Sequence, residues 1–432
     1  MSRKIYLLGA VLLALLLAPW VYDLPFVQDR VAWRVSELRA QIKYAISPPE
    51  EAVFTPNSTL SAMVDATLAA LMTPTPDAPP TEVPAEPTDP GPTLTPSPVP
   101  TSIPDHVFLT GIRHEYQKWN NCGPANLAMA LSYWGWEGDQ RPIASFTKPN
   151  SRDKNVMPYE LADYVSRETG FKVISRVGGD QALLKRLIAA GFPVIVEKGL
   201  EGAGFDGWMG HYQVLAGYDD ALGRFDAYDS YQGDFSYGNT LPISYEAMEE
   251  YWRHFNHQYL VVYPEAREAE VLGMLGSAAD EETNFRDTAQ QASDDIFSTS
   301  GRDQFFAWFN RGTNLMQLQD YSGAAAAYDE AFNLYAGLDP ETRPWRLLWY
   351  QTGPYWAYFY AGRYWDVLNL TTQTLYNMSE PVLEESYYWR GLAKEALGDV
   401  AGAIEDFQTS VEVHPGFGPA LTQLDRLGIS PQ

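Results

Sequence analysis

Residues 117–133 read Gln-Lys-Trp-Asn-Asn-Cys-Gly-Pro-Ala-Asn-Leu-Ala-Met-Ala-Leu-Ser-Tyr and contain the only cysteine of the chain, Cys122. The apolar spacing after the cysteine predicts a helix over 125–133, with Pro124 in its first turn, where a missing N–H costs nothing. The positive end of a helix dipole lowers the pKa of a thiol and favours the nucleophilic thiolate. Cys122 is therefore a candidate nucleophile, and the alternative is a small buried apolar residue.

A cysteine nucleophile needs a base and a group that orients the base. Among the six histidines, His211 stands out because it begins a predicted buried strand, 210–218, after a glycine-rich loop. The next predicted strand ends just before Asp229, and antiparallel pairing of the two strands would bring Asp229 close to His211. Asp226 is the alternative to Asp229, and His211 as a mere strand cap is the alternative to a base.

Taken together, these segments resemble the C39-type papain-like cysteine peptidases in their stand-alone form. The resemblance covers about residues 106–264 and rests, in chain order, on Gln117, Asn121-Cys122-Gly123-Pro124, Gly210-His211-Tyr212-Gln213-Val214-Leu215, Gly217-Tyr218-Asp219 and Tyr228-Asp229-Ser230. No ATPase segment follows, so the double-glycine leader preference of the exporter members is not carried over.

The resemblance implies a catalytic role for four residues. Cys122 would attack a carbonyl carbon, His211 would transfer the proton, and Asp229 would orient the imidazole. Gln117 and the backbone N–H of Cys122 would stabilise the oxyanion. A surface glutamine is the alternative for Gln117. The same acyl-enzyme thioester could be hydrolysed or transferred to an amine.

The rest of this region supports an α+β domain over 106–265, with helices packed on an antiparallel sheet. Helical spacing occurs at 158–168 and 180–190, and strand-like segments lie at 107–112, 171–175, 193–197, 224–228 and 258–263.

The N-terminus carries the features of an export signal. Arg3 and Lys4 precede an apolar run from Ile5 to Tyr22, so residues 1–23 form a signal anchor or a signal peptide. Retention as an anchor is favoured because the run lacks small residues at the spacing of a cleavage site. It would make the chain a single-pass cell-membrane protein with its catalytic and repeat domains outside the cytoplasm. Cleavage would make it a secreted protein.

Two segments that differ in amino-acid composition follow. Residues 24–72 are predicted to be a juxtamembrane helical segment, either a spacer or a helix lying along the lipid headgroups. Residues 73–105 form a Pro/Thr-rich linker that predicts a semi-rigid stalk lifting the rest of the protein off the membrane. A proline-rich ligand for a partner domain is the alternative to a stalk.

The C-terminal part predicts a helical connector over 266–300 and an all-α tetratricopeptide repeat domain over 301–432. Gly312 and Gly391 are each followed by a large residue at +9, an alanine at +12 and an aromatic residue at +16. Tyr355 marks a degenerate middle unit, which gives intervals of 43 and 36 residues. The ideal repeat is about 34 residues, so insertions are expected, and 419–427 would close the array.

Such repeats commonly bind peptides in a groove, so they predict docking of a substrate or a protein partner. Trp345, Trp349, Trp356 and Trp365 could line that groove, but large residues at helical spacing are expected in the core of any repeat array. The sequence favours a structural role for these tryptophans.

Composition limits the function further. With 30 Lys and Arg against 55 Asp and Glu, the net charge is −25, which argues against a nucleic-acid partner. One cysteine excludes a disulfide framework and multi-cysteine metal sites, and no cofactor or metal is predicted. The sequence predicts a membrane-anchored, extracytoplasmic cysteine peptidase with a peptide or protein substrate. The alternative is a catalytically inactive peptidase-fold scaffold or peptide-binding protein that acts through its repeats.

Overall fold

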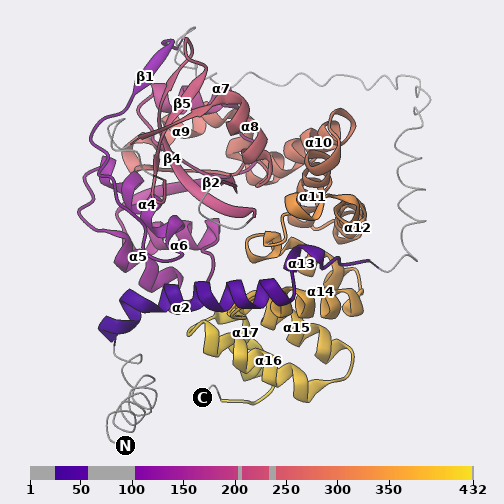
Figure 1. Cartoon of the computed structure of the whole chain (residues 1–432). Coiled ribbons are helices and arrows are strands. Elements are labelled where there is room, and N and C mark those ends of the chain that lie inside the picture. The colour runs from indigo at the N-terminus through magenta and orange to yellow at the C-terminus, as the bar shows by residue number, and fades with distance from the viewer. Residues whose placement is uncertain (1–24, 57–102, 203–206, 233–239, 431–432) are drawn as a thin grey trace, which may run out of the picture.

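The computed structural model describes residues 25–56, 103–202, 207–232 and 240–430, with the side chains of the first helix from residue 34 onward (Figure 1). An α+β domain is followed by a helical region. The predicted signal segment, 1–23, and most of the predicted linker, 73–105, lie outside the described residues. Within the described ranges, no helix has both the length and the apolarity needed to cross a membrane.

The α+β domain is built on one antiparallel sheet with the strand order β2-β7-β3-β4-β5-β6, and β1 pairs with β4 off this path. The strands are β1 (His106–Phe108), β2 (Phe171–Arg176), β3 (Val194–Leu200), β4 (Met209–Asp219), β5 (Arg224–Asp229), β6 (Thr240–Ser244) and β7 (Tyr259–Pro264). The antiparallel sheet confirms the predicted fold class. The sequence analysis did not anticipate β6.

Five helices accompany the sheet in the described part of this domain: α4 (Cys122–Tyr133), α5 (Gln140–Thr147), α6 (Pro158–Glu168), α7 (Gln181–Ala189) and α8 (Tyr245–Arg253). The predicted helices at 125–133, 158–168 and 180–190 correspond to α4, α6 and α7. Every residue of α4 from Gly123 to Leu131 is buried, and α4 packs on β4. Because β4 carries His211 and α4 begins at Cys122, this packing brings the two candidate residues together.

The helical region contains α9 (Glu268–Leu275), α10 (Glu281–Ser298), α11 (Gly301–Gln317), α12 (Tyr321–Gly337), α13 (Gly353–Tyr360), α14 (Tyr364–Asn377), α15 (Glu384–Ala396), α16 (Val400–Val413) and α17 (Gly418–Arg426). Glycine is required where paired helices touch. A Cβ on Gly312 would lie 2.8 Å from the Tyr328 ring, and one on Gly391 would lie 2.6 Å from the Phe407 ring. The +16 spacing seen in the sequence therefore places an aromatic ring against each glycine.

An insertion between α12 and α13 accounts for the long first interval. It contains two short 3₁₀ turns, Pro340–Thr342 and Leu347–Trp349. Trp349 is buried, and the half-buried Trp345 packs edge-on against it. The structural interpretation of the tryptophans is wrong for Trp365, which is 63% exposed. Trp356 is partly exposed, and its ring lies 5.1 Å from that of Trp389. Trp356 and Trp365 lie on helix faces that no other described element covers completely.

Helix α2 (Pro25–Ile46) and the segment after it pack on the repeats (Figure 1). Ser36 donates a hydrogen bond of 3.0 Å to Glu380, and Lys43 Nζ donates one of 2.7 Å to the Met378 carbonyl. Phe54 inserts its ring beside Phe332, 5.0 Å between centroids. The helical part of the predicted 24–72 segment is confirmed by α2. Its polar residues Ser36 and Lys43 contact the repeat region, and its apolar residues Val35, Leu38, Ile42 and Ile46 are exposed.

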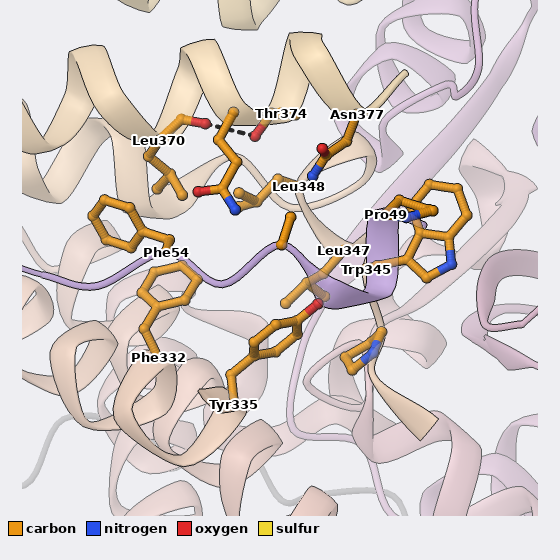
Figure 2. A pocket seen from close by; sticks show the side chains of 13 residues that line it. Pro49, Phe54, Phe332, Tyr335, Trp345, Leu347, Leu348, Leu370, Thr374 and Asn377 are labelled. Atoms are coloured by element: carbon orange, nitrogen blue, oxygen red, sulfur yellow. Dashed lines mark hydrogen bonds between the residues drawn. The ribbon is translucent and has the colours of Figure 1, made fainter. Parts of the chain in front are cut away.

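Figure 2 shows the pocket that this segment helps to form, together with α12, α14 and the insertion. It is lined by Pro49, Ala52, Phe54, Phe332, Tyr335, Pro344, Trp345, Leu347, Leu348, Leu370, Gln373, Thr374 and Asn377. None of the four predicted site residues lines this pocket.

Most of the predicted stalk, residues 73–105, lies outside the described residues. Of the described residues near it, Phe54 is buried in the repeat region, and the Pro104 carbonyl accepts a hydrogen bond of 2.6 Å from Tyr218.

Candidate active site

Cys122 is the first residue of α4 and is only partly buried. Asn120, two residues earlier, has a left-handed backbone with φ of 54°, which turns the chain into the helix. Burial disfavours the thiolate, but a hydrogen bond from His211, its charge, and the backbone N–H groups of Tyr212 and Gly123 outweigh burial. The pKa of Cys122 is therefore lowered, as the helix position predicted.

His211 lies near the start of β4 and is 2% exposed. Its Nε2 lies 3.0 Å from Asp229 Oδ1. Strand register explains this pairing: Asp229 is opposite Gln213, so His211 and Asp229 are diagonal neighbours on one face of the sheet. Burial lowers the pKa of His211, but the charge and hydrogen bond of Asp229, with the Cys122 thiolate, raise it to about 9.

Asp229 is fully buried at the end of β5 and is held in its ionised form. Burial raises its pKa, but the His211 charge and hydrogen bonds from His211 and Gln213 lower it to about 2. The backbone N–H groups of Tyr231 and Gln232 also donate to Oδ1, at 2.6 and 2.7 Å. Because Asp229 is hydrogen-bonded to Nε2 of His211, Nδ1 is the ring nitrogen that is available to the Cys122 thiol.

Asp226, the alternative to Asp229, lies elsewhere. Its carboxylate is 3.3 Å from Arg224 Nε, and it stands opposite Gly217 in β4. The structure therefore places Asp229, and not Asp226, beside His211.

Gln117 is held at the same end of the sheet. Its N–H donates to the Ser230 carbonyl at 2.8 Å, and its Oε1 accepts from the Ser230 hydroxyl at 2.8 Å. Because Ser230 occupies Oε1, the orientation of the side-chain amide is fixed and its Nε2 donors point the other way.

Sequence reasoning missed Asn126, which joins the parts of this site. Asn126 is fully buried in α4, and its Nδ2 lies 2.9 Å from the Cys122 carbonyl, 2.8 Å from the Tyr212 carbonyl and 3.0 Å from Ser230 Oγ. It thus connects the cysteine helix, the histidine strand and the residue that fixes Gln117. An asparagine on an otherwise apolar helix was the available signal, since buried amides find partners.

Two further buried ionisable groups lie on β3, and being adjacent they point to opposite faces of the sheet. Lys198 lies opposite His211, and burial lowers its pKa to about 8, although Asp229 opposes that shift. Burial, with the Cys122 charge, raises the pKa of Glu197 well above its usual value. Both causes favour the neutral form of the Glu197 carboxyl group.

The insertion of the repeat region packs against β4 at Gly210, the residue before His211. A Cβ on Gly210 would lie 2.8 Å from the Tyr350 ring, so only glycine fits between Tyr350 and β4. Arg346 Nη1 donates to the Trp208 carbonyl at 2.9 Å. The candidate site is thus bounded by both regions of the chain.

Comparison with known proteins supports this domain assignment. Residues 109–260 match the model of the peptidase C39-like family, and residues 384–416 match a tetratricopeptide repeat. No curated protein matches the chain.

Two solved structures are similar to part of the chain. One, from Bacillus anthracis and described as a C39-like peptidase, is 18% identical over 37% of this chain and 97% of its own, with a TM-score of 0.30. The other, xylellain, a cysteine protease from Xylella fastidiosa, is 14% identical over 37% of this chain and 86% of its own, with a TM-score of 0.30. From the two family matches, this chain carries a C39-like peptidase domain over residues 109–260 and a C-terminal tetratricopeptide repeat.

Proposed function

We propose that this protein is a cysteine peptidase that cleaves peptide bonds with Cys122, His211 and Asp229. The observation that carries the proposal is the hydrogen-bonded series of the partly buried Cys122, the buried His211 and the buried Asp229. The Cys122 pKa is lowered and the His211 pKa is raised to about 9, and both shifts favour the pair of thiolate and imidazolium. This charge state is the reactive one for a cysteine nucleophile.

In the proposed reaction, the Cys122 thiolate attacks the substrate carbonyl carbon and forms a tetrahedral intermediate. Its oxyanion accepts hydrogen bonds from the backbone N–H of Cys122 and from Gln117 Nε2. The His211 imidazolium then gives its proton to the leaving amine, and an acyl-enzyme thioester remains. The neutral imidazole next takes a proton from water, the hydroxide attacks the thioester, and the product acid leaves as the Cys122 thiolate is regenerated.

A scaffold with an inactive site is the alternative, and thiol reactivity distinguishes it from an enzyme. We expect Cys122 of the full chain to be alkylated by iodoacetamide at pH 6 faster than a free cysteine. His211→Ala should lower that rate about 10- to 100-fold, because the thiolate loses its counter-ion. Mass spectrometry of the Cys122 peptide over time measures both rates.

Peptide cleavage is the second readout of this experiment. Incubation with a peptide library should give products that Cys122→Ala does not give. His114→Ala is a matched control for His211→Ala, because the half-buried His114 bonds the Asp229 carbonyl and does not contact the thiol. Equal alkylation rates in the wild type and His211→Ala, with no cleaved peptide, would establish the scaffold alternative.

The repeats support a role in protein recognition beside the catalytic domain. Tetratricopeptide repeats bind proteins, and a peptidase domain implies a peptide substrate. Because Tyr350 of the insertion packs on Gly210, next to His211, a substrate held by this insertion would lie near the thiol. We propose that the repeat region positions the substrate or a protein partner.

We also propose that residues 1–23 anchor the protein in the cell membrane, with the folded regions outside the cytoplasm. The apolar run after Arg3 and Lys4 supports this placement. The full chain should remain in the membrane pellet after extraction with alkaline carbonate, and a variant without residues 1–23 should not. Recovery of the full chain in the soluble fraction would contradict the anchor and favour a cleaved signal peptide.

A further inference from the structure

A second cluster of chemically reactive side chains lies where the two regions meet, apart from Cys122. Asp153 comes from the loop before α6, Glu384 is the first residue of α15, and His414 follows α16. All three side chains are buried. They bring one possible ligand atom each to within 4.8 Å of one another.

The charges of Lys148 and Lys154 act on Asp153, but the ion pairs and hydrogen bonds of the nearby cations are made with other groups. Arg39 and Lys154 form ion pairs with Glu380, and Lys148 Nζ donates to the main-chain carbonyls of Asn120 and Asp153. In the described ranges, no lysine or arginine forms an ion pair with the carboxylate of Asp153 or Glu384.

One oxygen of the cluster has no partner at all. Glu384 is 3% exposed, and its Oε1 lies 2.7 Å from His414 Nδ1. Its Oε2 is buried and has no hydrogen-bond partner among the described residues. A buried carboxylate oxygen without a donor is costly, and proteins usually resolve that cost with a paired charge or a bound metal ion.

We propose that Asp153, Glu384 and His414 bind a zinc ion. One imidazole nitrogen and two carboxylate oxygens form a donor set that zinc accepts, with water in the remaining position. Calcium and magnesium prefer oxygen ligands alone. Ligands of a tetrahedral ion with bonds of about 2.0 Å lie about 3.3 Å apart, so small side-chain movements would close the present cluster around the ion.

The site would connect α15 and α16 to the loop that contains Asp153, and this loop contacts the turn before Cys122. The Asp153 carbonyl accepts a hydrogen bond of 3.0 Å from Asn120 Nδ2, and Asn120 precedes Cys122 by two residues. A zinc ion held by Asp153, Glu384 and His414 therefore connects α15 and α16 to the turn that enters α4. It acts as a structural clamp between the regions.

Zinc alone is the probe for this site. The full chain is used with the Cys122→Ala substitution, because a thiolate beside an imidazole binds zinc by itself. Equilibrium dialysis should show one tightly bound zinc ion per chain. Zinc should also raise the Tm by several degrees, because a ligand that binds only the folded state stabilises it.

Variants at the cluster locate the ion. Glu384→Gln and His414→Gln, in the same Cys122→Ala background, should each lose the bound equivalent and the rise in Tm. Glu412→Gln, an exposed glutamate in α16, should keep both. If either cluster variant fails to fold by circular dichroism, the stoichiometry of the parent chain still decides the question.

Three results would overturn the proposal. The first is no stoichiometric zinc in the parent chain. The second is zinc binding that survives both cluster substitutions. The third is a rise in Tm with calcium equal to that with zinc, which would mean that the His414 nitrogen is not a ligand.

Discussion

Asp229→Asn is expected to lower kcat/KM for peptide hydrolysis by about 10² to 10⁴-fold. The carboxylate offsets the burial that disfavours a charged His211, and it holds His211 by the Nε2 hydrogen bond of 3.0 Å. Asparagine keeps the shape and can still accept from the Tyr231 and Gln232 N–H groups, but it carries no charge. The imidazolium loses its stabilisation, and with it the Cys122 thiolate.

The pH dependence gives this variant a specific signature. The His211 pKa of about 9 in the folded protein lies above the ordinary value of 6.5. The His211–Asp229 ion pair therefore contributes stability that is fully present below about 6.5 and is lost as the pH rises through about 9, and the imidazolium needed for activity is lost over the same upper range. In Asp229→Asn the His211 pKa falls, so the upper limb of the profile of kcat/KM against pH should move down toward neutral pH.

Asp226→Asn is the matched control for Asp229→Asn. Asp226 lies three residues earlier on the same strand and pairs with Arg224. Its replacement should leave the upper limb near pH 9. A profile that moves equally in both variants would mean that general destabilisation, and not the loss of the His211 partner, causes the change.

The three catalytic candidates could be predicted from the sequence because each carries a local signal. Cys122 precedes a helical pattern, His211 begins an apolar strand, and Asp229 follows the next one. Two antiparallel strands that follow each other closely in the chain usually pair in the sheet. The pattern of the two strands therefore brings His211 and Asp229 together. Gly312 and Gly391 could be predicted for a similar reason. Each contacts an aromatic ring only 16 residues later, in the next helix of the same repeat.

The contacts between the regions were not predictable in this way. Lys43 reaches the Met378 carbonyl across 335 residues, and Tyr350 meets Gly210 across 140. Nothing in the periodicity of a helix or a strand identifies a distant partner. The amphipathic pattern of 24–46 correctly predicted a helix. The pattern did not identify which face meets the repeats: the polar residues Ser36 and Lys43 make those contacts, while Leu38 and Ile42 are exposed.

Trp208→Ala is expected to destabilise the whole protein by about 3–5 kcal/mol. Trp208 comes from the peptidase part of the chain, yet it is fully buried in the core of the repeat region. Its ring stacks on Phe255 at 5.6 Å and contacts Phe306 and Tyr350 at 6.0 and 5.8 Å. Its Nε1 also donates to His254 Nδ1 at 3.0 Å.

Because the two regions share this core, unfolding should be cooperative. Urea denaturation of the full chain, followed by circular dichroism, should show one transition, and Trp208→Ala should move its midpoint down without splitting it. Deletion of residues 301–432 would uncover Trp208 and Phe255, so a truncated chain does not separate docking from folding. Point substitutions in the insertion are therefore the appropriate way to test substrate positioning.

Trp365→Ala is the matched control for Trp208→Ala. Both substitutions remove a tryptophan ring, but Trp365 lies on α14 and is 63% exposed, so its loss should change the free energy of unfolding by no more than about 0.5 kcal/mol. Two transitions in the full chain, with only one of them shifted by Trp208→Ala, would mean that the regions fold separately. In that event the repeat insertion could move away from Gly210, and the packing of Tyr350 against β4 would be reversible instead of fixed.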